Sequence, residues 1–417
     1  MTVRTDDCDE VVVTGVGAVT AHGVGADALW DGVVAARPVA RVDDTDHPTG
    51  VVTAIDGLSV GDHLPRKLVA QTDRSVQFAL IAAREALHDA GVLGDSDALV
   101  GADAARAGVV IATGVGPVTS IIDEHERSDG GSGRVRPYLA VTMPVNMAAG
   151  RIAQRHRLHG PALVVASACA AGTDALGLAL DMIRSGRADL VVAGGAEAPI
   201  APLTLAAFRS AGALSTRVDD PAVASRPFDI DRDGFVLGEG AGVLVLESGR
   251  TARARGAPRR GAVLGHAASN DAHHPTQPAP DGRGAVAAVR AALADAGFAA
   301  DAIGHVNAHA TSTQRNDEVE ALVLRTVLGE QVGTVPVTAT KSTIGHLFGA
   351  AGAVEAIVAL RSAATGIVPP IANLGRVDPL CADLDLVTAR PRPIDRPLAL
   401  STSFGFGGHN AALLLRA

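Results

Sequence analysis

The chain has 417 residues and a formal net charge of −9, and 47% of its residues are hydrophobic while 19% are charged. Such a chain can bury a large core, which excludes wholesale disorder, and its length predicts two or three domains or one large duplicated one. The acidic balance, with only short basic clusters, argues against a nucleic-acid partner. Aromatic residues make up only 2% of the chain, so Ala, Val, Leu and Gly have to supply most of the core.

The three cysteines, Cys8, Cys169 and Cys381, are too few and too widely spaced for a disulfide framework or a metal knuckle. We therefore expect a reducing, cytoplasmic location, and the acidic N-terminus differs from a signal peptide. One apolar stretch, residues 162–183, resembles a membrane span but carries two aspartates, which are costly in lipid. We interpret it as a buried strand running into a buried helix and expect no contact with a membrane.

Apolar runs that end in glycine or polar residues predict strands, and two series of them alternate with helical patterns. The first series lies at residues 10–14, 108–112, 162–166, 190–193 and 242–246, with a helix at 73–90 that Gly91 ends. The second series lies at 262–266, 305–308, 335–338, 384–387, 398–402 and 411–415, with helices at 284–296 and 317–328. The alternation predicts α/β layers around buried sheets. Because the second series roughly repeats the first, we predict a duplicated fold with halves at 1–255 and 256–417.

Cys169 is the first candidate for chemistry, in the segment ALVVASACAAGTDALG that starts at Ala162. A buried strand ends near Ser167 and a small-residue helix begins near Ala170, so the cysteine lies at a strand-to-helix junction. A helix N-terminus lowers the pKa of a thiol and favours the thiolate, which would make Cys169 a nucleophile. A buried structural cysteine explains the same segment about equally well.

Three further segments carry side chains or backbone suited to chemistry. His309 ends a strand in HVNAHATST, Lys341 and His346 share ATKSTIGHLFGAAG, and SFGFGGHN at Ser403 places glycines after a strand. Those glycines would let backbone N–H groups face a ligand, as in an oxyanion hole. Taken singly, a structural histidine, a surface lysine and a plain glycine turn are simpler interpretations. Taken together with Cys169, the segments predict a thiol-based acyl-transfer site.

These motifs together resemble the β-ketoacyl-acyl-carrier-protein synthases of the thiolase superfamily, the elongating type of bacterial fatty acid synthesis and of polyketide synthesis. The resemblance runs from VVVTGVGAVTAHGVG at Val11 to GFGGHN at Gly405, and SACAAGTDALG, NAHATSTQRND, ATKSTIGHLFGAAGAVEA and TSFGFGGHN occur in the family's order. It implies an α/β, thiolase-like duplicated fold of five layers (α-β-α-β-α) with two mixed five-stranded sheets. It also implies decarboxylative Claisen condensation of an acyl thioester with a malonyl thioester on an acyl carrier protein.

From this resemblance, Cys169 would be the acylated nucleophile, and His309 and His346 would assist decarboxylation and stabilise the enolate oxygen. Lys341 would orient His346 through water or charge. The backbone N–H groups of Cys169 and Phe406 would form the oxyanion hole, and Phe406 would gate the acyl pocket. The chemistry agrees with this assignment, because decarboxylation supplies a carbanion equivalent near neutral pH and neutral imidazoles can donate hydrogen bonds to an enolate.

The resemblance implies further residues around that centre, and pocket depth would depend on segments 115–120 and 143–149 at the dimer seam. No metal or redox cofactor is implied, because the phosphopantetheine arm arrives on the acyl carrier protein. The substrate-binding set is Thr311 and Thr313, which would contact that arm, with Phe404 and Val115. The supporting acids are Glu355, the counter-ion of Lys341, and Asp317 and Glu320, which would brace the active-site loops.

Two other segments resemble ligand loops of unrelated families. DIDRDG at Asp229 has acids at positions one, three and five of a calcium loop, but position twelve is Gly240, and a strand follows instead of a helix. We reject calcium there and expect a structural turn near the active site. TGVGAVTAHGVG after the first strand lacks a G-x-G-x-x-G in register, so a dinucleotide-binding fold is poorly supported.

The acyl carrier protein would dock on a basic patch, which is sparse in this chain. Arg66 and Lys67 precede the first long helix, and Arg209 supplements them. His409 also departs from the family, because many members have Thr there. The family dimerises, so we expect a homodimer or, for the ketosynthase of a type II polyketide system, a heterodimer with a subunit like a chain length factor.

Two alternatives compete with a condensing enzyme. A non-catalytic scaffold of the same fold would not need Cys169, His309 and His346 intact. A thiolase that uses coenzyme A would need a second cysteine as acid and base near the glycine-rich C-terminal loop. Cys381 lies well before that loop, in the segment DPLCAD, which we interpret as a surface turn.

Overall fold

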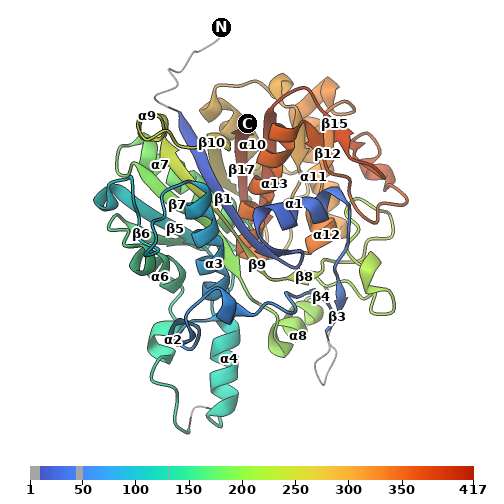
Figure 1. Ribbon diagram of the computed structural model, residues 1–417. Helices are drawn as coiled ribbons and strands as arrows, with labels where there is room; N and C mark the ends of the chain where they lie inside the picture. The colour runs from blue at the N-terminus through green and yellow to red at the C-terminus, as the bar shows by residue number, and fades with distance from the viewer. Residues whose placement is uncertain (1–9, 44–49, 131) are drawn as a thin grey trace.

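The computed structural model describes residues 10–43, 50–130 and 132–417, so Cys8 and the acidic N-terminal segment lie outside the described residues. The chain folds into five layers (Figure 1). Two sheet halves lie on either side of a central pair of helices, and further helices cover the outer faces. The layers follow from the sequence pattern, since each strand series is apolar enough to be buried on both faces.

The first half of the sheet has five strands in the order β1-β9-β7-β5-β6. β1 pairs antiparallel with β9, and β9 pairs antiparallel with β7. β7, β5 and β6 then run parallel to one another, which leaves β6 as the edge strand. Their bounds are β1 Val11–Thr20, β5 Ala107–Ala112, β6 Ala162–Val165, β7 Leu190–Glu197 and β9 Gly240–Ser248.

The second half repeats this plan in the order β10-β17-β16-β11-β12-β14. β10 pairs antiparallel with β17 and β17 with β16, and β16, β11 and β12 are parallel. The same sequence of antiparallel and parallel pairings confirms the predicted duplication. The bounds are β10 Gly261–Asn270, β11 His305–Asn307, β12 Pro336–Thr338, β14 Asp385–Leu386, β16 Leu398–Gly405 and β17 His409–Arg416.

The two halves are joined edge to edge. Val11, Val12 and Val13 of β1 pair with β10, so the described residues form one 12-stranded ladder, in which β14 adds a short sixth strand to the second half and β2 pairs with β1 alone. The thiolase-like layered fold is confirmed, with its two five-stranded sets continuous across this seam. The boundary predicted between residues 255 and 256 stays a prediction.

The central layer consists of α7 (Ala171–Arg184) and α13 (Ala351–Thr365). α7 packs on β5, β7 and β10, and α13 packs on β9 and β16, so each helix contacts strands of both halves. Their apolar side chains share one buried cluster with the inner faces of the strands. The N-terminal ends of these two helices lie beside each other, since Gly172 of α7 is in contact with the backbone of Ala353.

Outer helices complete the five layers. α3 (Arg74–Asp89) covers β1, β7 and β9, and α10 (Arg283–Ala296) covers β10 and β17. The other helices are α1 Ala26–Val34, α2 Arg66–Val69, α4 Val118–Arg127, α5 Leu139–Thr142, α6 Met147–His156, α8 Pro202–Ser210, α9 Gly249–Ala254, α11 Gln314–Leu328 and α12 Lys341–Ile344. The remaining short strands are β2 Gly23–Val24, β3 Arg41–Val42, β4 Val51–Thr53, β8 Leu237–Gly238, β13 Ile367–Val368 and β15 Arg392–Pro393.

The apolar stretch at 162–183 is β6 followed by α7, as predicted. Within the described part of the chain, one helical segment, Phe348–Thr365, is long and apolar enough to cross a membrane by length and composition, but 83% of it is buried inside the protein. It is the core helix α13 with the 3-10 turn that precedes it. Its apolar composition is therefore explained by its place between the two sheet halves.

β1 continues well past the predicted end at Gly15. Gly15 and Gly17 are not turn residues but contact points, because a Cβ at either position would overlap the backbone of α3. Two carboxylates of α3 bind the backbone at this contact: Asp89 accepts a hydrogen bond from the Val16 N–H at 3.0 Å, and Glu85 accepts one from the Ala18 N–H at 2.9 Å. The missing side chains thus allow the helix to lie directly on the strand.

We predict that Gly17→Ala lowers the free energy of unfolding by about 1–3 kcal/mol or more, because its Cβ would lie 2.8 Å from the Ala86 N and closer still to the Ala82 O. Urea denaturation would measure the change. Gly61→Ala is the matched control, since nothing lies within 4 Å of the added carbon, and it should stay within about 0.5 kcal/mol of the parent protein. Equal stability of the two variants would contradict the prediction.

Candidate active site

A cavity of about 400 Å³ opens between the two halves of the chain. The first half contributes Cys169 and Phe235 to its wall, and the second half contributes His309, His346 and Phe406. The residues that were singled out from four separate motifs are thus brought to one place. The cavity lies at the junction of the halves, where the N-terminal ends of α7 and α13 meet.

Cys169 lies in a single 3-10 turn, Ala168–Ala170, between β6 and α7. The preceding residue, Ala168, has φ +50°, a left-handed backbone conformation that is unusual for residues other than glycine. Gly405 allows the turn to lie against β16, because a Cβ there would be 3.0 Å from the Cys169 N. The sharp turn thereby presents the sulfur to the cavity while the side chain remains 6% exposed.

Burial raises the pKa of the Cys169 thiol to about 12, against the Lys341 charge and a hydrogen bond from the Phe406 N–H, which lower it. The expectation of a thiol pKa lowered by the helix N-terminus is therefore wrong. The desolvation of the thiolate outweighs the favourable groups around it. Cys169 rests as a neutral thiol, and the Phe406 N–H points at its sulfur.

His309 and His346 face each other with ring centroids 5.4 Å apart and planes at 85°. Both are buried, and burial together with the positive charge of Lys341 places the pKa of each imidazole well below its ordinary value of 6.5. Both rings are therefore neutral at pH 7. A neutral imidazole can donate a hydrogen bond to a developing oxyanion, which is the state that the sequence led us to expect.

The Lys341 ammonium contacts His309 and not His346. Its Nζ donates to the His309 carbonyl oxygen at 2.6 Å, lies 3.2 Å from His309 Nδ1 and forms a buried ion pair with Glu355. Glu355 is thus the counter-ion of Lys341, as expected. The imidazole in direct contact with Lys341 is that of His309, whereas we expected that of His346. The charge of Lys341 lowers the pKa of His346, after burial.

Glu320 holds the backbone around His309. Its carboxylate accepts hydrogen bonds from the His309 N–H at 2.8 Å, the Ala310 N–H at 2.7 Å and the Thr402 hydroxyl at 2.7 Å. Asp317 lies one turn earlier in α11 and accepts a hydrogen bond from the Phe228 N–H at 2.9 Å. Burial raises the pKa of both acids, that of Glu320 to about 7. Both carboxylates thus hold backbone segments in place, and their effect on catalysis stays a prediction.

The expected substrate-binding residues fall into two groups. Thr311, Thr313 and Phe404 line the cavity, and the two hydroxyls are 2.9 Å apart. Val115 lies outside the cavity wall and is 37% exposed. The three basic residues expected at a docking surface, Arg66 and Lys67 on α2 and Arg209 on α8, also lie outside the cavity wall.

Two family models match the chain: the beta-ketoacyl synthase N-terminal domain over residues 8–252 and the beta-ketoacyl synthase C-terminal domain over residues 260–375. The chain belongs to the beta-ketoacyl synthase family. It is accordingly a condensing enzyme of the acyltransferase type. The cavity of this family member is lined by a thiol and two neutral imidazoles, and the buried Lys341 lies against His309.

Named relatives and solved structures agree with this family. The chain is 40% identical to 3-oxoacyl-[acyl-carrier-protein] synthase 2 of Synechocystis, with 97% of each chain covered, and 41% identical to that of Rhizobium meliloti, with 97% and 98% covered. A beta-ketoacyl synthase structure from Burkholderia phymatum matches with a TM-score of 0.87, 34% identity and 98% and 99% coverage. The ishigamide ketosynthase/chain length factor matches with a TM-score of 0.88, 34% identity and the same coverage.

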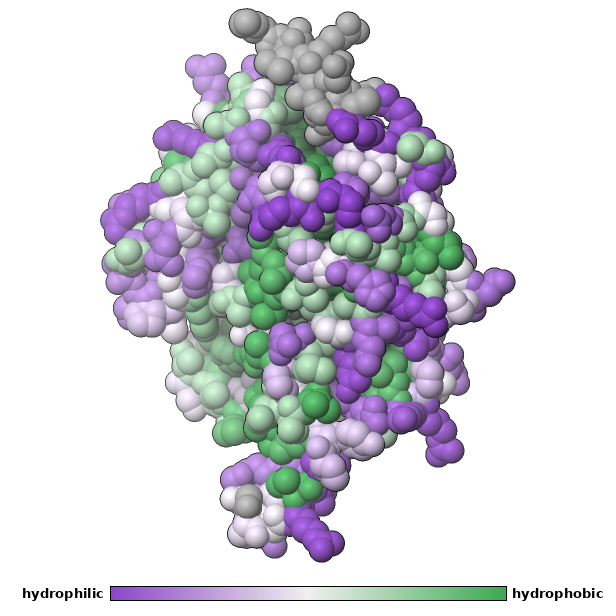
Figure 2. Space-filling model, turned by 90° about the vertical axis from the view of Figure 1, so that its left-hand side faces the viewer, coloured by the Kyte–Doolittle hydropathy of each residue, from purple (hydrophilic) through white to green (hydrophobic). Residues whose placement is uncertain are grey.

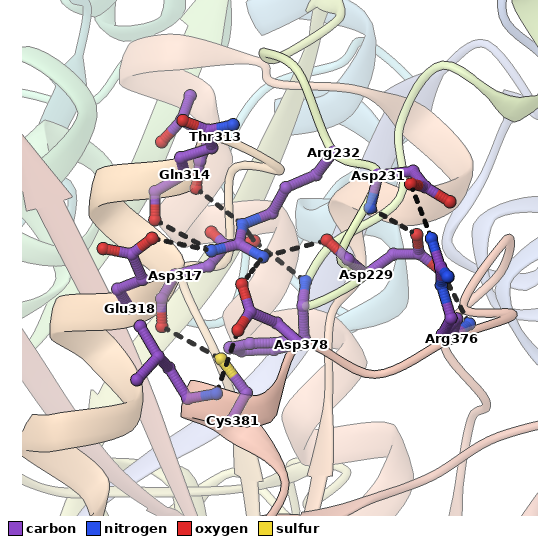
Figure 3. A network of polar contacts seen from close by, with 12 residues as sticks. Asp229, Asp231, Arg232, Thr313, Gln314, Asp317, Glu318, Arg376, Asp378 and Cys381 are labelled. Atoms are coloured by element: carbon purple, nitrogen blue, oxygen red, sulfur yellow. Dashed lines mark hydrogen bonds and ion pairs between the residues drawn. The ribbon is translucent and has the colours of Figure 1, made fainter.

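The loop that resembled a calcium site is held by protein groups in this beta-ketoacyl synthase. Asp229 accepts hydrogen bonds from the backbone N–H groups of Gly375 at 2.9 Å and Arg376 at 2.8 Å. Arg232, whose side chain is 1% exposed, donates to the Asp378 carboxylate and to the carbonyl oxygens of Asp229, Thr313 and Gln314 (Figure 3). The turn therefore fixes the backbone of the segment that carries Thr313 into the cavity.

Cys381 belongs to the same network and is not on the surface. It lies in the 3-10 turn Pro379–Cys381, is fully buried, and its thiol is 3.8 Å from the Asp317 carbonyl oxygen (Figure 3). The interpretation of this segment as a surface turn is therefore wrong for the cysteine, although Leu380 beside it is 58% exposed. Cys381 contributes nothing to the cavity wall, so it cannot serve as a second catalytic thiol there.

Sequence reasoning missed an aromatic cluster beside Cys169. Phe208 has its ring centroid 5.7 Å from that of Phe235, 5.0 Å from that of Phe348 and 6.4 Å from that of Phe406. Five of the chain's eight phenylalanines, counting Phe404, gather at this site, and only the folded chain shows this. An apolar wall of this kind suits the hydrocarbon part of an acyl chain.

Glu197, at the end of β7, was missed as well. It is fully buried, and burial raises its pKa to about 7 against the hydrogen bonds that it accepts. No sequence motif distinguished this glutamate from the apolar strand around it. Its donors are neutral backbone and hydroxyl groups that come from two loops far apart in the sequence, so only the folded chain reveals the cluster.

We predict that alkylation of Cys169 by iodoacetamide accelerates about tenfold for each pH unit between pH 6.5 and 9.5, because the thiolate fraction rises steadily below a thiol pKa of about 12. Intact-protein mass would follow the reaction, with Cys169→Ala as the background. A free cysteine levels off above its pKa of about 8.5 and serves as the reference. A plateau for Cys169 below pH 8 would show that the thiolate is stabilised, contrary to the prediction.

Proposed function

We propose that this beta-ketoacyl synthase catalyses decarboxylative Claisen condensation between an acyl chain held on Cys169 and a malonyl group held on an acyl carrier protein, in fatty acid or polyketide biosynthesis. The observation that carries the proposal is the shared cavity, in which the Cys169 thiol, the Phe406 N–H and two neutral imidazoles converge. The relatives named 3-oxoacyl-[acyl-carrier-protein] synthase 2 support it.

In the first step, the Cys169 sulfur attacks the carbonyl carbon of the incoming acyl thioester. The new carbon–sulfur bond forms as the bond to the carrier's sulfur breaks, and the thiol proton leaves with the carrier's thiolate as a thiol. The tetrahedral oxyanion accepts hydrogen bonds from the backbone N–H groups of Phe406 and Cys169. A covalent intermediate divides the reaction into two easier steps.

In the second step, the malonyl thioester loses its carboxylate as carbon dioxide. The electron pair of the broken carbon–carbon bond becomes an enolate, whose oxygen accepts hydrogen bonds from the neutral imidazoles of His309 and His346. The enolate carbon then attacks the acyl carbonyl, and the Cys169 sulfur leaves as a thiolate that regains a proton. Neutral donors suit this step because they stabilise the enolate without protonating the carbon that has to react.

The reaction as proposed needs no metal or redox cofactor, since the carbanion equivalent comes from decarboxylation. Thr311 and Thr313 would hydrogen-bond the amide groups of the phosphopantetheine arm. The carrier protein, which is acidic in this proposal, would dock near Arg66, Lys67 and Arg209. A solved relative, described as a type II PKS acyl-carrier protein in complex with its ketosynthase bound to the hexaketide, matches at 32% identity and a TM-score of 0.87. A cytoplasmic location completes the proposal.

Acylation identifies the nucleophile. Mixing the protein with acyl carrier proteins that bear acyl chains of several lengths should add one acyl group to the intact mass, and Cys169→Ala should add none. Cys381→Ala is the matched control and should be acylated like the parent protein, because that thiol lies outside the cavity wall. Loss of acylation in the Cys381 variant alone would contradict the assignment and favour thiolase-like chemistry.

We also propose that the protein dimerises through the face that carries β6. This strand is the edge of the 12-stranded ladder, and its residues are apolar, with Leu163 38% exposed. Figure 2 looks at the side of the molecule on which β6 and α6 lie in Figure 1 and shows hydrophobic side chains gathered there. Further exposed apolar residues come from the flanking segments: Val115, Ile121, Met143 and Val145. An unpaired apolar edge strand is a site for pairing with a second strand.

The oligomeric state tests this face. Light scattering of the wild-type protein should give twice the chain mass of 42.0 kDa, and Leu163→Asp should give a monomer, because a charge at the strand edge is costly to bury. Leu380→Asp, at a 58% exposed position in the other half, is the control and should leave the dimer intact. A monomeric wild-type protein that becomes active only with a second, different subunit would replace the homodimer by a heterodimer of the chain-length-factor kind.

A further inference from the structure

The His346 imidazole lies flat against the ring of Phe348. The two centroids are 4.7 Å apart and the planes differ by 9°, so the phenyl ring supports one face of the imidazole. Phe235 meets His346 edge-on, with centroids 5.5 Å apart. The Nδ1 atom of His346 is buried and has no hydrogen-bond partner among the described residues, so none of them fixes the plane of the ring through this atom. The orientation of this imidazole therefore depends on aromatic packing.

Phe348 is held in an unusual backbone conformation. Its φ is +45°, in the left-handed region that residues with a side chain seldom adopt. Such a conformation costs about 1–3 kcal/mol and persists only where the surroundings impose it. The next residue, Gly349, provides the restraint, because its N–H donates to the Glu197 carboxylate at 3.0 Å. The buried carboxylate of Glu197 thus fixes, as a hydrogen-bond acceptor, the peptide that follows Phe348.

The same carboxylate binds the loop at residues 113–116. It accepts the hydroxyl hydrogen of Thr113 at 2.9 Å and the N–H groups of Gly114, Val115 and Gly116. The loop and Gly349 are in direct contact, since a Cβ on Gly349 would lie 2.5 Å from the Thr113 carbonyl carbon. Glu197 therefore joins two loops from different halves of the chain at the point where Phe348 meets His346.

We propose that Glu197 is a positioning residue, which holds Phe348 in its left-handed conformation and thereby sets the orientation of the His346 imidazole for decarboxylation. The proposal rests on the function proposed above, in which His346 donates to the enolate oxygen. Glu197 does not line the cavity, so it acts only through Phe348 and His346. Misplacing the donor by a fraction of an ångström weakens a hydrogen bond that is needed only as charge develops.

The charge of Glu197 separates its positioning role from a merely structural one. The Glu197 carboxylate is one of the charges that, after burial, raise the pKa of the Cys169 thiol. Removing that charge makes the thiolate easier to form, which favours acylation. Removing the carboxylate also releases Gly349, which disfavours decarboxylation. A positioning role hence slows decarboxylation without slowing acylation to the same extent, whereas general damage to the fold would slow both.

The test uses Glu197→Gln, which keeps the size of the side chain but puts an amide N–H₂ group where a carboxylate oxygen accepts hydrogen bonds. At pH 8, acylation from an acyl carrier protein is followed by intact mass, and decarboxylation by the release of labelled carbon dioxide from malonyl carrier with pre-acylated enzyme. We expect decarboxylation to fall about 10- to 100-fold. We expect acylation to stay within about threefold of the parent rate or to exceed it.

A double-mutant cycle with Phe348→Leu tests whether Glu197 acts through Phe348. Phe348→Leu should show the same loss of decarboxylation, and the double variant should be no slower than Phe348→Leu alone. Glu247→Gln is the control for loss of a buried glutamate, since Glu247 is fully buried and binds Thr14 and Arg255 away from the cavity. It should leave both half-reactions unchanged.

Each outcome has a defined meaning. Equal slowing of both half-reactions in Glu197→Gln, or multiplied losses in the double variant, overturns the positioning role. If Glu197→Gln fails to fold, unchanged decarboxylation in Phe348→Leu overturns it by itself. A parent enzyme that neither takes up an acyl group nor releases carbon dioxide refutes the proposed function instead, and that failure is visible before any variant is made.

Discussion

The buried positive charge of Lys341 is the constraint on which the rest of the site depends. A buried ammonium needs a counter-ion and full hydrogen bonding, and Glu355 on the central helix α13 and the His309 carbonyl oxygen supply them. Burial lowers the pKa of the His309 and His346 imidazoles, and this nearby cation lowers it further, so both rings are kept neutral. The chemistry that follows is hydrogen-bond donation to an oxyanion and not proton transfer from an imidazolium. One charge pair thus links helix α13 to the backbone of His309 and adds to the burial that keeps two imidazoles neutral.

Small residues allow α7, β7 and α13 to pack closely enough around this buried charge pair. Gly172 of α7 lies against α13, where a Cβ would be 2.8 Å from the Ala353 N, and Gly195 of β7 lies against the turn before α13, where a Cβ would be 3.0 Å from the Ala350 Cα. These contacts bring backbone from both halves within reach of one cavity. The composition, rich in Gly and Ala and poor in aromatics, is therefore a requirement of the central layer, and the few phenylalanines are concentrated where the cavity needs an apolar wall.

The sequence predicted the layers, the duplication and the convergence of Cys169, His309 and His346, because apolar periodicity and motif order are local properties of the chain. It could not predict what depends on the meeting of distant segments. The thiol pKa of Cys169 follows from burial by both halves, and the contact of Lys341 with His309 follows from the relative placement of α12 and β11. Glu197 could not be predicted for the same reason. Its role depends on the two loops that it joins, and the sequence of its strand resembles that of any other buried strand. Motifs thus predict which groups are present, while packing decides which of them touch.

The hydrogen bonds of Glu197 also connect the cavity with the outer face of the molecule. Val115 donates its N–H to this carboxylate while its side chain is exposed beside the edge strand β6, and Gly349 donates from the other side, next to Phe348. The Glu197 side chain therefore links the Val115 backbone to Gly349, which follows Phe348, whose ring stacks on His346. Close-packed interiors transmit small displacements instead of absorbing them. A second subunit seated on the β6 face would in this way bear on the geometry of decarboxylation.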